Sequence, residues 1–245
     1  MATRGSSLRR WVCCFALAAV LLPGFVGTSS SSTNAAPVEL RAYTFIDSLQ
    51  PQLASFIATV ARGFLPLEDQ AALFVEISPG LHINVLTDLV VKRTAAIPGM
   101  QIVERAYGLL EVHHQDQGQI REAGRVIFEN LGLKEEDRLK PLITSTQMIT
   151  GVENYHTHLI NTMRHGQFLL KNETLLVVEC HPAAYAAIAA NEAEKVAPIN
   201  LLEMISFGAF GRLYLGGPED NIREASAAIE KTLAGLDGRP NAGKS

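Results

Sequence analysis

Leu73-Phe-Val-Glu-Ile-Ser-Pro79 and Leu176-Val-Val-Glu-Cys-His-Pro182 are two versions of one segment, 103 residues apart. The same offset holds without a gap from residue 63 to residue 108, where it pairs Gly63 with Gly166, Lys92 with Lys195, Ile102 with Ile205, Ala106 with Ala209 and Gly108 with Gly211. After a one-residue deletion, Gln119-Ile-Arg-Glu-Ala123 meets Asn221-Ile-Arg-Glu-Ala225. Self-similarity at a fixed spacing is typical of repeated structural units, so the chain contains two copies of one unit.

Both copies predict the element order β-α-β-α-β-β-α. Strands are expected at 40–46, 72–77 and around 101–112 in copy one, and at 142–149, 175–180 and around 201–215 in copy two. Helices are expected at 53–61, 83–94, 155–163 and 183–196, and a last helix in each copy buries one face, Ile120, Ala123, Ile127 and Leu131 or Ile222, Ala225, Ile229 and Leu233. This mixture predicts an α/β (α+β) sandwich with helices on an antiparallel or mixed sheet.

Composition divides the chain into two unlike parts. The whole chain of 245 residues is 47% hydrophobic with a net charge of −4, which argues against a disordered or strongly nucleic-acid-binding protein. Residues 1–36 hold three Arg, no acidic residue, the only Trp and two of the three Cys, whereas residues 37–245 have a net charge of −7. One Cys in the body gives no disulfide framework.

The N-terminal segment has the three-part layout of a secretory signal. Basic residues up to Arg10 precede an apolar run from Trp11 to Val26, and polar residues followed by Ala35-Ala36 complete the pattern. Pro23-Gly24 breaks the apolar run too early for a permanent membrane span. The alternatives are a misplaced start or a disordered extension.

Seven histidines raise the question of a metal site. His113-His114, His156, His158, His165 and Cys180-His181 are of the right types, but none has a specific ligand spacing, and neither copy repeats the set of the other. We therefore expect surface or structural histidines, no metal and no cofactor. Motifs of serine hydrolases, phosphate-binding loops and paired cysteines are absent from the sequence.

The clearest difference between the copies falls at the turn between the paired strands. Copy one has Glu104-Arg105 where copy two has Phe207-Gly208, followed by Ala209 and Phe210. In a monomer, Glu104 and Arg105 are best explained as a solvated charge pair. In a symmetric ring, three arginines about 6 Å apart would repel by about 3 kcal/mol per pair, so each would need a carboxylate such as Glu104 of a neighbouring chain.

Several motifs together resemble the tandem-domain bacterial microcompartment shell proteins, in particular those of carboxysomes. They are Val38-Glu-Leu-Arg41, Ile46-Asp-Ser-Leu-Gln-Pro-Gln52, Glu76-Ile-Ser-Pro-Gly80, Val103-Glu-Arg105, the segment from Ala184 to Lys195 and the segment from Gly208 to Gly217. The resemblance runs from about residue 37 to about residue 239.

The resemblance implies two circularly permuted, ferredoxin-like shell domains, at 37–133 and 142–236, with a linker at 134–141 and a tail at 237–245. Three chains would form a pseudo-hexameric tile, and two trimers can stack in that family. The family's pore-gating pair falls on Glu104 and Arg105, and Phe207, Gly208, Ala209 and Phe210 form the second pore loop. The pore would pass metabolites such as sugar phosphates of carbon fixation.

The resemblance also implies tile-edge lysines at Lys92, four residues after Asp88, and at Lys195, where Asn191 replaces the Asp. The expected partners are copies of this chain, other carboxysome shell proteins and small phosphorylated metabolites, without nucleic acid or membrane. Because carboxysomes assemble in the cytoplasm, the resemblance implies that residues 1–36 are a signal-like N-terminal extension or result from a misplaced translation start. The alternative function is an exported metal-dependent enzyme or binding protein that uses the histidines.

Overall fold

The computed structural model describes residues 37–243, and these lie in one compact unit, Ala36–Ser245. The signal-like segment predicted over residues 1–36 lies outside the described residues. Within residues 37–243, no helix combines the length and apolar character that a membrane span requires.

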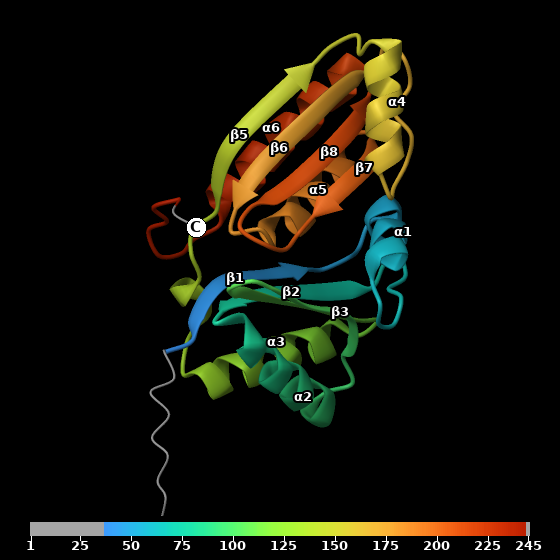
Figure 1. Cartoon of the computed structure of the whole chain (residues 1–245). Coiled ribbons are helices and arrows are strands. Elements are labelled where there is room, and N and C mark those ends of the chain that lie inside the picture. The colour runs from blue at the N-terminus through green and yellow to red at the C-terminus, as the bar shows by residue number, and fades with distance from the viewer. Residues whose placement is uncertain (1–36, 244–245) are drawn as a thin grey trace, which may run out of the picture. The chain divides into compact units, whose positions relative to one another are not determined.

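The predicted order β-α-β-α-β-β-α is confirmed in both copies (Figure 1). Copy one consists of β1 (Glu39–Ile46), α1 (Pro51–Val60), β2 (Ala71–Ser78), α2 (Ile83–Arg93), β3 (Ile97–Glu104), β4 (Tyr107–His114) and α3 (Gln117–Leu131). Copy two consists of β5 (Leu142–Ile149), α4 (Asn154–Met163), β6 (Thr174–His181), α5 (Tyr185–Val196), β7 (Asn200–Ile205), β8 (Gly211–Gly217) and α6 (Glu219–Gly235).

Each copy forms its own four-stranded sheet, with strand orders β1-β2-β4-β3 and β5-β6-β8-β7. Every strand pair is antiparallel. If the first strand of each copy is counted last, both orders become 4-1-3-2, the arrangement of a ferredoxin-like βαββαβ unit. The predicted circular permutation is thereby confirmed.

Local sequence explains where the elements begin and end. Helix α1 has Pro51 in its first turn, where a missing N–H costs nothing. Helix α3 starts at a cap in which the Asp116 side chain accepts from the Gly118 N–H, and it ends at Gly132 with φ 65°. Every residue of β2 from Ala71 to Ile77 is buried, as its run of apolar residues predicts, and the one charged residue in that run, Glu76, is buried as well.

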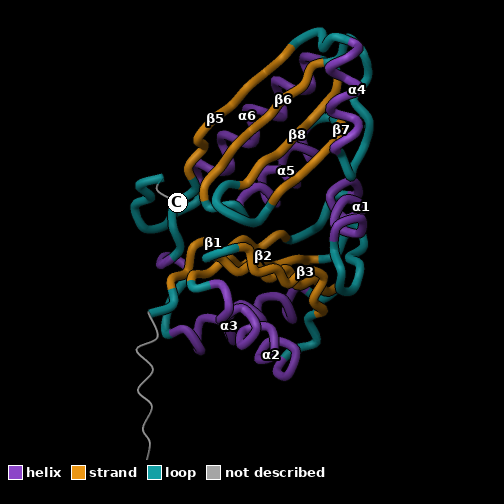
Figure 2. Tube along the Cα trace, viewed as in Figure 1, coloured by secondary structure: helices purple, strands orange, loops and turns teal. Residues whose placement is uncertain are grey.

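Sheet one is covered on both faces. Helices α2 and α3 lie on one face, over a core that includes Leu73, Val75 and Ile77. The opposite face, with Phe74 and Leu109, shares a second core with α5 and other parts of copy two. Figure 2 shows the strands of sheet one between these helices and copy two. The copies are therefore packed together rather than joined by an open tether.

The segment predicted as a charged linker is partly built into this packing. Arg138 is buried, and its guanidinium donates to the carbonyl oxygens of Tyr43 and Asp237. The Tyr185 hydroxyl, from α5, donates to the carbonyl oxygen of Leu139 at 2.6 Å. Burial raises the pKa of Tyr43 to about 12.

Candidate functional site

Each of the two interstrand turns has a residue with positive φ at the corresponding position. Arg105, between β3 and β4, has φ 52°, and Gly208, 103 residues later, has φ 93°. Copy two places a glycine where the left-handed conformation is required, whereas copy one holds an arginine in it. A positive φ costs a non-glycine residue about 1 kcal/mol or more. The exposed Arg105 is therefore retained at a cost in stability.

The turns also lie side by side. A Cβ atom added to Gly208 would lie 3.5 Å from Cγ of Glu104, so the structure brings the predicted gating residue of copy one against the predicted pore loop of copy two. Within the chain, Arg105 Nε is 3.6 Å from Glu104 Oε1, and the arginine side chain is 92% exposed. Such an exposed pair contributes little to stability, and Arg105 is therefore free to change partner.

The second pore loop is held more firmly than the first. Ser206 and Gly208 are buried, and Phe207 packs against the core that the copies share. The ring of Phe210 lies 5.7 Å from that of His181, and only Ala209 is exposed. The four predicted residues thus form one loop with an anchored base.

A buried ion pair beneath both turns was missed by the sequence analysis. Arg41 Nε donates to Glu76 Oε1 at 2.7 Å, and both side chains are almost wholly inaccessible. The Arg41 guanidinium stacks on Tyr107, 3.6 Å from the ring centre, and donates to His181 Nε2 at 3.0 Å. The available signal was a charged residue inside each of two apolar strands, which indicates a paired buried charge.

The predicted edge lysines have different surroundings. Lys92 is exposed and pairs with Asp88 one helical turn away. Lys195 is less exposed and bridges Glu192 to Asp47 of copy one, and this contact lowers the pKa of the Asp47 carboxyl against the opposing effect of partial burial. Their role at a tile edge stays a prediction.

The structure gives a reason for Asn191 in place of an aspartate. This side chain is fully buried, its Oδ1 accepts from the Gln50 N–H at 2.9 Å, and its Nδ2 donates to the carbonyl oxygen of Ser48. An amide provides both the donor and the acceptor, whereas a carboxylate would provide only acceptors.

The histidines are dispersed. His113 is buried beside Glu111, His165 contacts Glu203, and His181 belongs to the Arg41 group. Between residues 37 and 243, no three His, Cys, Asp or Glu side chains gather closely enough to hold a metal ion. Burial raises the pKa of the Cys180 thiol to about 12, so this thiol is protonated at neutral pH.

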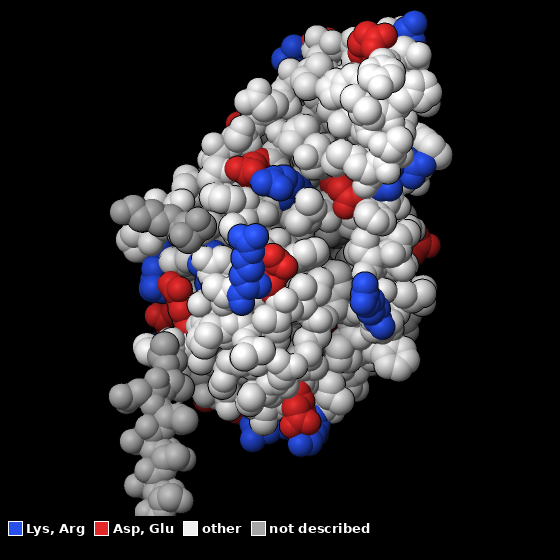
Figure 3. Space-filling model, viewed as in Figure 1, with Lys and Arg blue, Asp and Glu red and all other residues white. Residues whose placement is uncertain are grey.

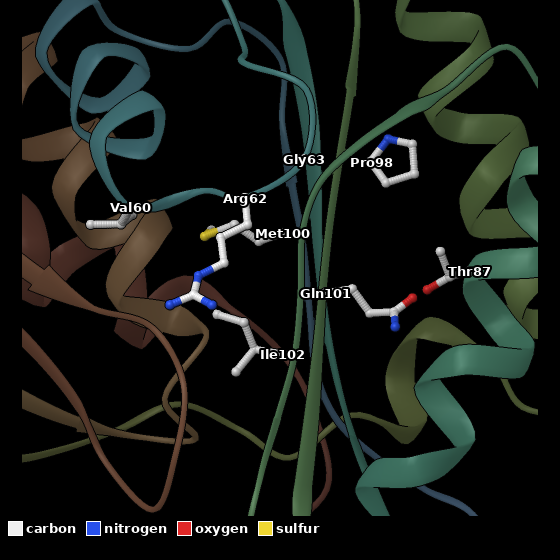
Figure 4. A pocket seen from close by; sticks show the side chains of 9 residues that line it. Val60, Arg62, Gly63, Thr87, Pro98, Met100, Gln101 and Ile102 are labelled. Carbon is white, nitrogen blue, oxygen red and sulfur yellow. The ribbon is translucent and has the colours of Figure 1, made fainter.

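Two cavities flank β3, the edge strand of sheet one. One, of about 340 Å³, is lined by residues that include Arg62, Thr87, Pro98 and Gln101. Figure 4 shows the Arg62, Met100 and Ile102 side chains on one side of the strand and those of Thr87 and Gln101 on the other. The second, of about 680 Å³, lies between β3 and β7 and is lined by residues that include Ile102 and Phe207.

Charge is evenly mixed on the face shown in Figure 3. There, acidic and basic side chains lie close to one another among large uncharged areas. A nucleic-acid-binding surface instead concentrates basic side chains.

Comparisons with known proteins agree on one kind of relative. The family model described as the CsoS1D N-terminal domain matches residues 40–137. The carboxysome shell protein CcmP of Synechococcus elongatus is 52% identical over 206 residues, which cover 84% of this chain and 97% of that protein. The carboxysome shell protein CsoS1D of Hydrogenovibrio crunogenus is 42% identical, over 81% of this chain and 98% of that protein.

Two solved structures have the same fold. The fused permuted hexameric shell protein MSM0275 of the RMM microcompartment matches with a TM-score of 0.80 and 38% identity, over 82% of this chain and 99% of its own. The double ringed trimeric shell protein MSM0271 of the same microcompartment matches with a TM-score of 0.80 and 36% identity, over 83% of this chain and 100% of its own.

Proposed function

The chain belongs to the family of tandem-domain carboxysome shell proteins that includes CcmP and CsoS1D, and we propose that three copies close into a tile with a pore on its axis. Members of this family are structural shell proteins rather than enzymes. The proposed location is accordingly the carboxysome shell, where the tile contacts other shell proteins.

One observation supports the ring above all others: the two copies make unequal use of corresponding surfaces. Helix α1 of copy one lies against copy two, where Gln52 Nε2 donates to the carbonyl oxygen of Ile199 and the Leu201 N–H donates to Gln52 Oε1. Phe56, on the same helix, is 1% exposed. The corresponding helix α4 instead presents Tyr155, Leu159 and Met163 to solvent, with exposures of 70%, 51% and 41%.

The surface that α4 would occupy is open on copy one. Helix α1 covers the edge strand β7, and the cavity beside it near Gly166 is about 140 Å³. At the corresponding place beside β3, near Gly63, the cavity is about 340 Å³. Helix α4 of a second chain therefore fits beside β3 as α1 fits beside β7.

This contact is head-to-tail, since copy two of one chain meets copy one of the next. A head-to-tail contact closes into a ring when its rotation divides a full turn. The contact between copies inside the chain supplies half of the seams of a pseudo-hexamer, and three chains supply the rest. The double ringed trimeric relative supports the same number of chains, and it also supports the stacking of two rings.

In such a ring the turns at 105–106 and 206–210 line the axis. Arg105 would then face its own copies, and the repulsion between them favours contact with Glu104 of a neighbour. Release of Arg105 would leave a cationic opening that attracts anions. We therefore propose a gated pore for phosphorylated metabolites such as sugar phosphates, and place Lys92 and Lys195 along the outer rim of the seams.

The seam is tested by Leu159→Asp, which puts a charge on the exposed face of α4 without disturbing a buried group. We expect a trimeric mass for the natural chain and a monomeric mass for the variant, measured by native mass spectrometry. Val196→Asp is the matched control, because Val196 is 42% exposed and is the last residue of α5, a different helix of copy two. This variant should remain trimeric. A natural chain that stays monomeric, or a trimeric Leu159→Asp variant, would contradict the proposed ring.

A further inference from the structure

The buried group around Arg41 joins the two pore turns inside one chain. On one side, Arg41 stacks on Tyr107, which pairs with Glu104 across the first turn. On the other side, Arg41 Nη2 donates to His181 Nε2, and the His181 ring packs on Phe210 of the second turn.

The hydrogen bonds specify the state of the imidazole. Arginine can only donate, so His181 Nε2 must accept and therefore carries no proton. The proton is on Nδ1, which donates to Asn241 Oδ1 at 3.0 Å. Asn241 in turn donates to the carbonyl oxygens of Lys140 and His181, so the C-terminal segment holds the ring from its other side. The neutral histidine is thus fully satisfied.

A second proton on His181 would disrupt this arrangement. It would replace the accepting nitrogen by a donor that faces the Arg41 cation 3.0 Å away. Burial and the Arg41 charge both lower the pKa of His181, and they outweigh the bond to Asn241 and the Glu39 carboxylate, which favour protonation. Glu39 is itself paired with Arg239, and Glu76 is paired with Arg41.

The corresponding position in copy one has no imidazole. Ser78 stands where copy two has His181. In copy two, Thr144 and Glu179 are the counterparts of Arg41 and Glu76, and Glu179 contacts Thr144 and Arg212 at the surface. A ring of three chains would therefore contain this group in the three seams within chains and in none of the seams between chains.

We propose that Arg41 and His181 are positioning residues for both pore turns, and that protonation of His181 loosens the two turns together. The contacts are those of a single chain, and only the relevance of the turns to a pore rests on the proposed function. The neutral imidazole holds Tyr107 through Arg41 and holds Phe210 directly, so loss of the Arg41 bond frees both.

Hydrogen exchange measures this directly on the full chain. Protection factors, corrected for the intrinsic effect of pH, should fall in peptides that span residues 103–108 and 206–211 as the pH is lowered from 7.5 to 5.5. One linked proton changes the opening equilibrium by up to about tenfold per pH unit. His181→Gln should abolish this dependence and keep protection at pH 7.5, because its amide can accept from Arg41 and donate to Asn241.

His113→Gln is the control, since His113 is a buried histidine paired with Glu111 and separate from the Arg41 group; it should retain the pH dependence of the natural chain. Turns that do not respond to pH in the natural chain, or that respond equally in His181→Gln, would overturn the inference. The same samples report the oligomeric mass. A monomer with pH-sensitive turns refutes the ring alone, whereas a trimer with insensitive turns refutes this inference alone.

Discussion

Copy one and copy two have one backbone plan but opposite surroundings. Strand β1 is buried over most of its length, whereas no residue of the corresponding β5 is buried. Leu109 lies in the core shared between the copies, and Arg212, at the corresponding position, is exposed. The difference teaches that copy two covers copy one inside the chain, while the equivalent face of copy two is not covered within the chain.

The largest expected difference between the copies is at Phe56 and its counterpart Leu159. Phe56→Ala should lower the free energy of unfolding by about 3–5 kcal/mol, because it leaves a cavity in the shared core. Leu159→Ala should change it by less than about 1 kcal/mol in the isolated chain and should weaken the trimer instead. Denaturant unfolding at low protein concentration, with native mass spectrometry, separates these effects; equal losses of stability would remove the distinction between the two helices.

A smaller effect is expected at Asn191 and its counterpart Asp88. Asn191→Asp should destabilise the chain by about 1–3 kcal/mol at pH 7, since the buried carboxylate faces the Ser48 carbonyl oxygen without a donor. Burial would raise the pKa of this aspartate, so the loss should be small below about pH 4 and should grow as the pH rises. Asp88→Asn, on an exposed side chain, is the matched control. Thermal unfolding at several pH values measures the stability of both variants. A loss of stability in Asn191→Asp that does not depend on pH would contradict the buried contact.

The turns should respond to substitution in opposite directions. Gly208→Ala should cost about 1–2 kcal/mol, because φ 93° is unfavourable for any residue with a Cβ. Arg105→Gly should gain up to about 1 kcal/mol by relieving the same strain in copy one. Changes in the melting temperature at fixed protein concentration test this pair. Shifts of the same sign would show that the two turns are not equivalent.

The smallest effect on stability is expected when both gating residues are removed. Glu104→Ala with Arg105→Ala should change the free energy of unfolding by less than about 0.5 kcal/mol, since the pair is exposed. Trimers should remain intact with a permanently open axis, visible by cryo-electron microscopy. A closed axis in the double variant would refute the gate.

The sequence was sufficient for the fold because repetition doubled the evidence for each element. An offset of 103, which becomes 102 for the last helix, placed every strand and helix of one copy on its counterpart, and it aligned the turn that contains Glu104 and Arg105 with the turn that contains Gly208. It did not identify Arg41 or His181, because their partners are distant in the chain: Glu76 is 35 residues from Arg41 and His181 is 140 residues away. No periodicity reports contacts between residues of different copies.

The sequence by itself determined the number of copies, the order of their elements and the asymmetric charged turn. These depend on local patterns of polarity and turn residues, which are written twice in the chain. Only the tertiary structure decided which copy is covered and which is left open, and that Arg41 and His181 connect the two turns. Burial and pairing across the chain depend on how two folded surfaces meet, so they arise only when both copies are assembled.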